Sequence, residues 1–135
     1  MTENNTHLTI GKSAEQIACQ FLTEKGLKPL ITNYRCYHGE IDIILKDKDD
    51  IVFVEVRARG RRDYGSALES ITKHKIKKIT RAATHFLQIK KWLYKVSSRF
   101  DIVTLQANHN TEIKSNNLNQ WQIEWIKNAF WQEGF

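Results

Sequence analysis

Acidic residues stand inside two segments that are otherwise apolar. Glu40 and Asp42 belong to Glu40–Leu45, and Glu55 belongs to Ile51–Val56. Both segments are rich in β-branched residues, and runs that are apolar on both faces are typical of central strands. Because an ionised carboxylate is costly to bury without a partner, each strand acid requires a compensating proton or cation.

A polar turn between the two segments predicts how they pair. Asp47–Asp50 is a turn-forming cluster, so the two strands are expected to form a hairpin. With the turn centred in the middle of this cluster, Asp42 faces Glu55. Facing side chains of an antiparallel pair have Cβ atoms about 4.5–5.5 Å apart, close enough for two carboxylates to share one cation. A shift of one residue in register would place the acids on opposite faces.

This register predicts an oxygen-rich pocket. Asp42 and Glu55 supply carboxylates, the backbone carbonyl of Val56 adds an oxygen nearby, and Glu15 is a candidate third carboxylate from the first helix. Carboxylate, carbonyl and water oxygens are the ligands that Mg²⁺ and Mn²⁺ prefer. Spacing alone leaves a structural alternative open. In that alternative, the acids form ordinary ion pairs with Lys46, Arg57 or Arg59.

The elements that position these acids follow from residue patterns. Apolar residues recur at helical spacing over Leu8–Lys25, and Gly26 is placed to end that helix. A second helix is expected over Ser70–Lys91, with Ile79 and Phe86 on its apolar face. The remaining strands are expected at Pro29–Cys36, Arg99–Leu105 and Trp121–Trp125.

The resulting order, α-β-β-β-α-β-β, predicts an α/β fold. A central mixed β-sheet of about five strands is flanked by helices in such an arrangement. We expect residues 1–135 to form this single domain, with flexible ends at 1–7 and 131–135. The Asn-rich segment Asn108–Gln120 is expected to be the most mobile internal loop.

The charge balance favours polyanionic partners. The 135 residues include 21 Lys and Arg against 15 Asp and Glu, a net charge of +6. Such a surplus favours nucleic acid or an anionic surface. No apolar run approaches the roughly 18–20 residues of a membrane span, so a transmembrane protein is excluded. A cytoplasmic location is expected, because the N-terminus lacks signal-peptide features and the two cysteines have no CxxC spacing.

Basic residues flank the predicted pocket in sequence. They follow the second central strand or lie on the second helix. Cations placed in this way contact phosphate backbones without reading a base sequence. The alternative is an ordinary solvated helix face. The candidate nucleic-acid-binding residues are Arg57, Arg59, Arg61, Arg62, Lys73, Lys75, Lys77, Lys78 and Arg81.

Three further residues are candidates for supporting the pocket from a second layer. Glu40 faces Arg57 in the expected register, two residues beyond the acidic pair. Arg99 and Asp101 share one face of their strand. For these last two, an ion pair at the edge of the sheet is the alternative.

Several segments in this order resemble the YraN family of small bacterial proteins. The similarity runs from residue 10 to residue 130, and its most specific parts are the second and third of the segments. The segments are Gly11-x-x-Ala14-Glu15, Gly39-Glu40-Ile41-Asp42, Phe53-Val54-Glu55-Val56-Arg57 and Lys75-x-x-Lys78-Ile79.

That family is similar to the PD-(D/E)xK nuclease superfamily, and within it to the archaeal Holliday-junction resolvases. The similarity implies a restriction-endonuclease-like fold and a Mg²⁺- or Mn²⁺-dependent endonuclease acting on DNA, including branched DNA in repair or recombination. By position, Asp42 and Glu55 would be metal ligands and Glu15 the helical acid. Because the related resolvases act as dimers, the resemblance also implies a homodimer.

One position departs from the superfamily pattern. Arg57 occupies the place of a lysine that is thought to position or activate the attacking water. Arginine is not deprotonated in proteins, so Arg57 is unsuited to act as a base, although it can hold phosphate oxygens. The alternative function is therefore a non-catalytic nucleic-acid-binding module, an accessory to a repair or recombination complex that keeps the nuclease fold. The catalytic candidates are Glu15, Asp42, Glu55 and Arg57.

Overall fold

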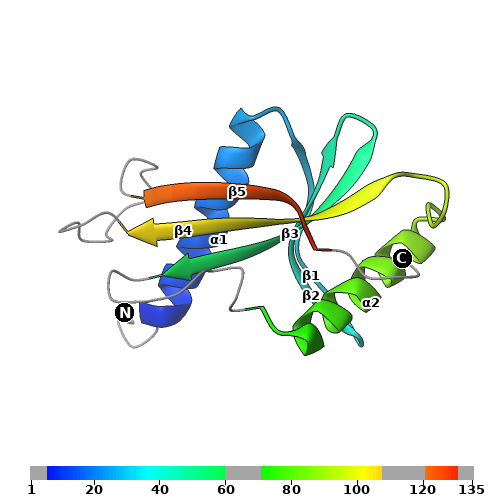
Figure 1. Ribbon diagram of the computed structural model, residues 1–135, viewed down its shortest axis with the longest axis horizontal. Coiled ribbons are helices and arrows are strands. Elements are labelled where there is room, and N and C mark those ends of the chain that lie inside the picture. Colours follow the sequence, from blue (N-terminus) through cyan, green and yellow to red (C-terminus); the bar gives the residue numbers. More distant parts are fainter. Residues whose placement is uncertain (1–5, 60–70, 108–120, 131–135) are drawn as a thin grey trace.

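The computed structural model describes residues 6–59, 71–107 and 121–130 (Figure 1). Within these ranges the elements follow the order α-β-β-β-α-β-β, so the predicted order is confirmed. Their bounds are α1 (Thr6–Glu24), β1 (Lys28–Cys36), β2 (Gly39–Asp47), β3 (Asp50–Arg59), α2 (Lys73–Ile89), β4 (Ser98–Ala107) and β5 (Trp121–Phe130).

The strands form one mixed sheet in the order β1-β2-β3-β4-β5. β3 and β4 run parallel, whereas the other neighbouring strands are antiparallel. A parallel pair needs a crossover connection, and here that connection contains α2. The α/β class and the mixed five-stranded sheet expected from the sequence are both confirmed.

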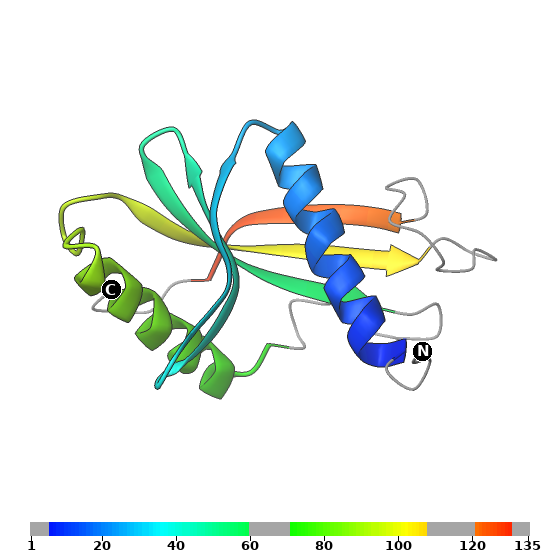
Figure 2. The same ribbon diagram turned by 180° about the vertical axis from the view of Figure 1, so that it is seen from behind.

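The two helices pack on opposite faces of this sheet. α1 packs with Val54 in one hydrophobic core, which we call the α1-side core. α2 packs with Phe53 in a second core, the α2-side core. Because adjacent strand residues point to opposite faces, the helices cover opposite sides. Figure 2 shows α1 crossing in front of the sheet, and Figure 1 shows the same helix behind it.

The β2–β3 hairpin has the register that the turn predicts. Lys46 pairs with Ile51 and Ile43 pairs with Val54. Lys48, inside the predicted turn, has a φ of 57°, the left-handed conformation that tight turns require. The register on which the acidic pair depends is therefore confirmed up to the residues next to that pair.

The sheet is interrupted at Asp42. The ladder between β2 and β3 ends one residue before it. Pairing between β1 and β2 is present on both sides of Asp42 but omits Asn33, the residue opposite, whose φ is 54°. Ile41 and Ile44 both pack in the α2-side core, although residues three apart in a regular strand point to opposite faces. β2 therefore twists at Asp42, and the far half of the β1–β2 hairpin packs against α2.

Some expected boundaries differ in the structure. Arg57 and Arg59 were expected to follow the second central strand, but they belong to β3. α2 begins at Lys73 because the Thr72 side chain caps it. The predicted mobile loop Asn108–Gln120 and the predicted flexible ends lie outside the described residues, apart from the last residues of 1–7, which begin α1. Within the described ranges, neither helix is long and apolar enough to cross a membrane.

Candidate functional site

Asp42 lies where β2 and β3 part. Its Oδ2 accepts a hydrogen bond of 2.8 Å from the backbone N–H of Val56. The carboxylate thus replaces the β2 backbone carbonyl that would accept this N–H if the strand pairing continued. This role explains why an acid is tolerated inside an apolar strand. The bond also fixes the side chain beside the β3 residues that follow the end of the ladder.

Glu55 meets Asp42 at this break. Its side chain is 4% exposed, and the two carboxyl groups share a hydrogen bond. Burial, followed by the negative charge of Glu55, raises the pKa of Asp42 to about 8, and the charge of Glu15 adds to the rise. At neutral pH the pair therefore retains a proton, as expected for two carboxyl groups too close to ionise together.

Two cations converge on Glu55. Its Oε2 lies 2.7 Å from Nζ of Lys75 and 3.1 Å from Nη2 of Arg57. The Nε–H of Arg57 is buried and has no hydrogen-bond partner among the described residues, the kind of unsatisfied donor that calls for an explanation. Glu55 therefore forms one of the ion pairs that spacing left open as an alternative, the pair with Arg57. Its second ion pair is with Lys75, a residue that the alternative did not include.

Lys75 was predicted only as a contact for a phosphate backbone. In the structure it lies in the first turn of α2, where its backbone N–H donates to the Thr72 hydroxyl at 3.1 Å. A Thr before a helical run is a recognisable N-cap signal, so the start of α2 could have been found. By contrast, no local feature of the sequence indicates that this turn places the Lys75 ammonium group on Glu55.

Gly39 allows α2 to approach β2 closely enough for this contact. A Cβ atom at Gly39 would lie 3.1 Å from the backbone oxygen of Lys78. The absence of a side chain therefore lets the helix backbone sit directly over the strand. A cavity of about 380 Å³ opens beside this contact, lined by Gly39, Glu40, Asp42, Glu55, His74, Lys75, Lys78 and Ile79.

Glu15 reaches the acidic pair from the opposite side. It comes from α1 and forms side-chain hydrogen bonds with Asn33 and Asp42. Burial raises the pKa of Glu15, with the charge of Glu40 and then that of Glu55 contributing, while the hydrogen bonds oppose the rise. The break in the sheet thus lets one aspartate contact acids from both faces. The third carboxylate suggested by the sequence does contact the pair.

Glu40 does not face Arg57 as the register suggested. The pairing between β2 and β3 ends before it reaches Glu40. Glu40 instead lies opposite Arg35 of β1 and forms an ion pair with it, at 3.6 Å between Oε1 and Nε. It still lines the same cavity as Asp42.

Of the remaining candidates, Lys73, Lys77, Lys78 and Arg81 are exposed on α2. Arg61, Arg62 and the side chain of Arg59 lie outside what the structure describes.

Arg99 and Asp101 form a separate network instead of a second layer around the pocket. Asp101 is fully buried, and it accepts from Arg99 Nε at 3.1 Å, from Trp125 Nε1 at 2.9 Å and from the backbone N–H of Asn128 at 3.0 Å. Arg99 also pairs with Asp47, at 2.9 Å. Of the two possibilities left by the sequence, the ion pair is the one observed, although it is buried.

The donor chemistry at the pair suits a hard divalent cation. Within the described ranges, no group of three or more His, Cys, Asp and Glu side chains is spaced to hold a metal ion. Asp42 and Glu55 nevertheless retain a proton because Asp42 is buried and because the two charges repel, and a divalent cation could replace that proton. These two side chains fit as ligands, whereas Glu15 and the Val56 carbonyl stay predictions for that role.

The raised pKa of Asp42 predicts a pH dependence of stability. In the folded protein Asp42 keeps its proton up to about pH 8, whereas its ordinary pKa is 3.8. The free energy of unfolding should therefore fall as pH rises from about 4 to about 8, by at most about 1.4 kcal/mol per unit for one proton. An asparagine at this position does not titrate, so Asp42→Asn should become increasingly more stable than the parent as the pH rises through this range.

Urea unfolding in EDTA at several pH values between 5 and 8 measures this difference. Glu124→Gln, which neutralises an exposed acid on β5, is the matched control and should follow the parent curve. Parallel curves for the parent and Asp42→Asn would contradict the shared proton.

The fold and site together define a class of protein: a small mixed-sheet α/β domain with a buried acidic pair at a break in the sheet and cations facing it. The chain matches the model described as "Uncharacterised protein family UPF0102" over residues 14–105. It is 43% identical over 124 residues to a UPF0102 protein of Saccharophagus degradans, which covers 92% of this chain and 94% of that protein.

Further relatives agree. The chain is 38% identical over 130 residues to a UPF0102 protein of Pseudomonas aeruginosa, covering 96% of this chain and 98% of that protein. It is 40% identical over 120 residues to one of Legionella pneumophila, covering 89% and 92% respectively. The chain therefore belongs to the UPF0102 family, which is the YraN family that the motifs resembled.

Proposed function

We propose that this protein is a metal-dependent nuclease that hydrolyses phosphodiester bonds in DNA. The observation that carries the proposal is the meeting of Asp42 and Glu55 at a break in the sheet, with Lys75 and Arg57 beside them. Carboxylates that hold a divalent cation next to fixed positive groups are what phosphodiester hydrolysis requires. Family membership is compatible with this reading but names no activity.

Each side chain has a role that its chemistry supports. Asp42 and Glu55 hold the cation, which when bound lowers the pKa of a coordinated water and offsets charge on the phosphate. Lys75, whose side chain is 43% exposed, can leave Glu55 and contact a phosphate oxygen. Arginine does not give up its proton in proteins, so the role of Arg57 is to offset negative charge and not to transfer a proton.

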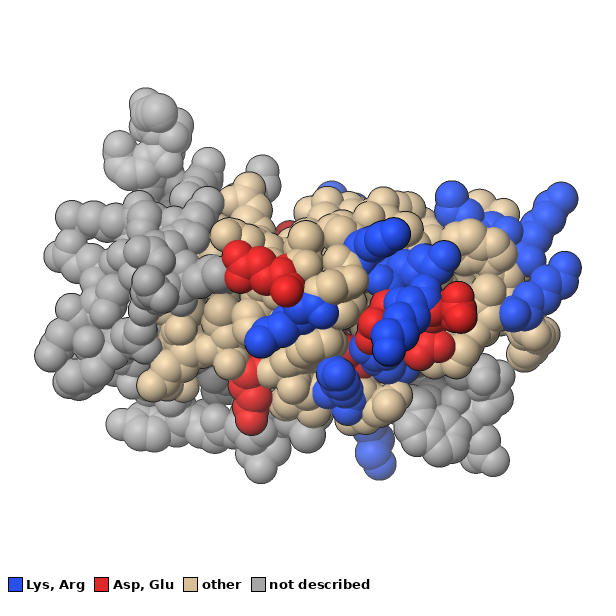
Figure 3. Space-filling model, turned by 90° about the horizontal axis from the view of Figure 1, so that it is seen from above, with Lys and Arg blue, Asp and Glu red and all other residues tan. Residues whose placement is uncertain are grey.

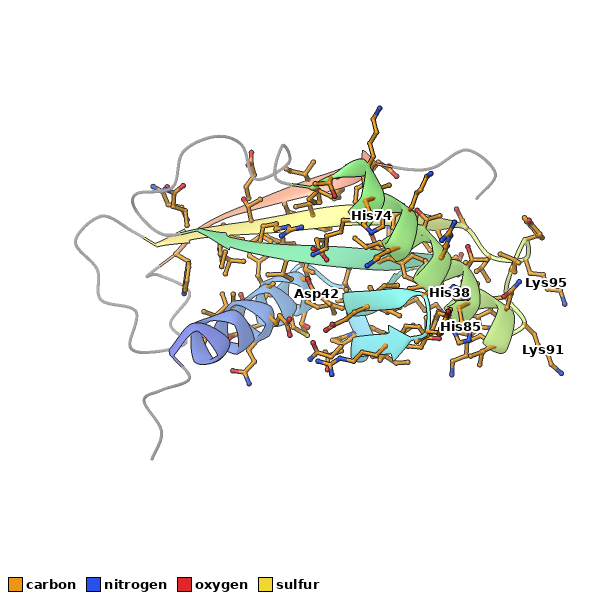
Figure 4. All side chains as sticks on the ribbon, turned by 90° about the horizontal axis from the view of Figure 1, so that it is seen from below. His38, Asp42, His74, His85, Lys91 and Lys95 are labelled. Carbon is orange, nitrogen blue, oxygen red and sulfur yellow. The ribbon has the colours of Figure 1, made fainter. Side chains whose placement is uncertain are left out.

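The exposed face of α2 supplies an approach for the DNA backbone. His74, Lys75 and Lys78 of α2 line the cavity that contains the acidic pair. Figure 4 labels His74 on α2 and Asp42. By contrast, Figure 3 shows a face on which Lys and Arg side chains intermingle with acidic ones. The basic residues exposed on α2 are Lys73, Lys77, Lys78 and Arg81.

A second candidate function is a DNA-binding module without cleavage. It is favoured by one observation, the arginine at position 57 with its guanidinium held against Glu55. A lysine there could help to activate water, but an arginine cannot give up its proton. Both candidates require salt-sensitive DNA binding, since each phosphate contact releases bound counterions. Only the first requires turnover.

The test is incubation of the purified protein with four-way junctions, flaps, linear duplex and single strands, each with Mg²⁺, Mn²⁺ or EDTA. We expect cleavage that needs a divalent cation and stops in EDTA. Asp42→Ala, prepared in parallel, controls for a contaminating nuclease. Binding without cleavage in every condition would favour the second function, and the absence of salt-sensitive binding would contradict both.

A further inference from the structure

An aromatic surface lies at the turn between β1 and β2. Tyr37 in this turn is fully exposed, at 100%, so its ring gains nothing from folding. Tyr37 and the adjacent His38 meet edge to face, with ring centroids 5.6 Å apart. A bare aromatic ring on a surface is a feature that binding explains better than stability does.

The exposed ring is connected to the core by a series of ring contacts. His38 lies 6.0 Å from His85 of α2, and the Nδ1 atom of His85 is hydrogen-bonded to the hydroxyl of Tyr34. Tyr34 in turn packs edge to face on Phe86, a buried residue of the α2-side core, at 5.4 Å. The turn that carries Tyr37 is thereby held against the helix, which lowers the entropy lost when a ligand stacks there.

A basic stripe joins this surface to the cavity of the acidic pair. His74, Lys78, Arg81 and His85 follow one another at intervals of four, three and four residues, so they share one face of α2. The first two line the cavity, and the last contacts His38. Figure 4 shows His38 next to His85, with His74 further along the same helix. A phosphate chain lying along the stripe would reach both ends.

We propose that Tyr37 and His38 stack on unpaired bases of a DNA strand whose backbone follows this stripe to the acidic pair. The inference rests on the proposed function and names its substrate class, DNA with unpaired nucleotides beside the scissile phosphate. Tyr37 lies five residues from Asp42 along the chain, at most about 16 Å at the rise of an extended strand. That distance spans a few nucleotides.

The requirement for unpaired bases follows from the stacking itself. Bases inside a duplex already stack on their neighbours, so an aromatic side chain can take their place only where bases are splayed out. Aromatic platforms beside a cationic groove are how proteins hold single strands without reading sequence. Single strands and branched junctions both offer such bases, and the test separates them.

The test measures binding in EDTA, where no cleavage occurs, using DNA that carries the fluorescent base 2-aminopurine. The probes are a single strand, a forked duplex labelled at the branch, and a fully paired duplex of the same length. We expect Tyr37→Ala to weaken binding to the first two about 5- to 100-fold. Binding to the duplex should be unchanged, and Tyr37→Phe should behave as the parent.

Tyr94 provides a matched control, because it is 83% exposed but lies beyond the end of α2. Tyr94→Ala should bind every probe as the parent does. An equal loss on all three probes, or no loss for Tyr37→Ala on the unpaired ones, would overturn the proposal. A loss on the forked probe alone would assign the surface to branch points.

These outcomes are independent of those for the nuclease function. Stacking that depends on Tyr37 in a protein that cleaves nothing would keep this inference and remove the nuclease. If Tyr37→Ala cleaves unpaired DNA at the parental rate, the nuclease function is kept and this inference is removed. A protein that binds none of the probes would contradict both.

Discussion

Asp42→Asn and Glu55→Gln should each slow DNA cleavage at least about 100-fold. A bound cation supplies several kcal/mol of stabilisation to the transition state, and about 1.4 kcal/mol corresponds to a factor of ten. Both changes keep the size of the side chain while removing the charge that would attract the cation. Calorimetry with Mn²⁺ should show binding by the parent and none by either variant.

Glu40→Gln is the matched control for these two substitutions. Glu40 lines the same cavity, but it is 43% exposed and pairs with Arg35, so its replacement should change Mn²⁺ affinity only slightly. Asp42→Asn should fold at least as well as the parent, because the asparagine oxygen can still accept from the Val56 N–H. If both acid variants bind Mn²⁺ as the parent does, the assignment of the site fails.

Replacing Asp101 should have the largest effect on stability. Asp101→Ala leaves the Nε–H of Arg99, the indole N–H of Trp125 and the backbone N–H of Asn128 without their shared acceptor. Breaking a buried ion pair in this way costs about 3–5 kcal/mol, a large part of the 5–15 kcal/mol that stabilises a typical domain. Urea unfolding should show a large shift of the midpoint to lower denaturant.

Asp101→Asn separates charge from hydrogen bonding at this position. It retains an acceptor oxygen, so its loss of stability should be smaller than that of the alanine variant. Where the variant remains folded, its Mn²⁺ affinity should equal that of the parent, because the Asp101 network is separate from the acidic pair. A parental unfolding midpoint for Asp101→Ala, or a loss of Mn²⁺ binding by folded Asp101→Asn, would contradict this division.

The comparison of Asp42 with Asp101 explains why one marks a candidate site and the other a structural centre. Both accept a backbone N–H near an irregularity in strand pairing, and both lie within strands. Asp101 is surrounded by donors, which stabilise its charge. Asp42 is surrounded by other acids, which do not. Net stability is given up at Asp42, as is common where a protein binds a ligand.

Local patterns were sufficient for the element order and for the hairpin register. The turn at Asp47–Asp50 and the apolar strands on either side allow one register that buries their side chains, and that register brought Asp42 to Glu55. Helical periodicity placed α1 and α2 within a few residues of their observed bounds. The acidic pair could therefore be predicted from the sequence.

The tertiary structure alone decided what surrounds that pair. Lys75 looks like any other cation of a solvated helix until the close approach at Gly39 places it on Glu55. The left-handed conformation of Asn33 and the twist at Asp42 have no local signal, yet they let Glu15 reach Asp42 from the opposite face. Strand pairing is set by neighbours in sequence, whereas the partners of a buried charge are set by packing between elements far apart in the chain.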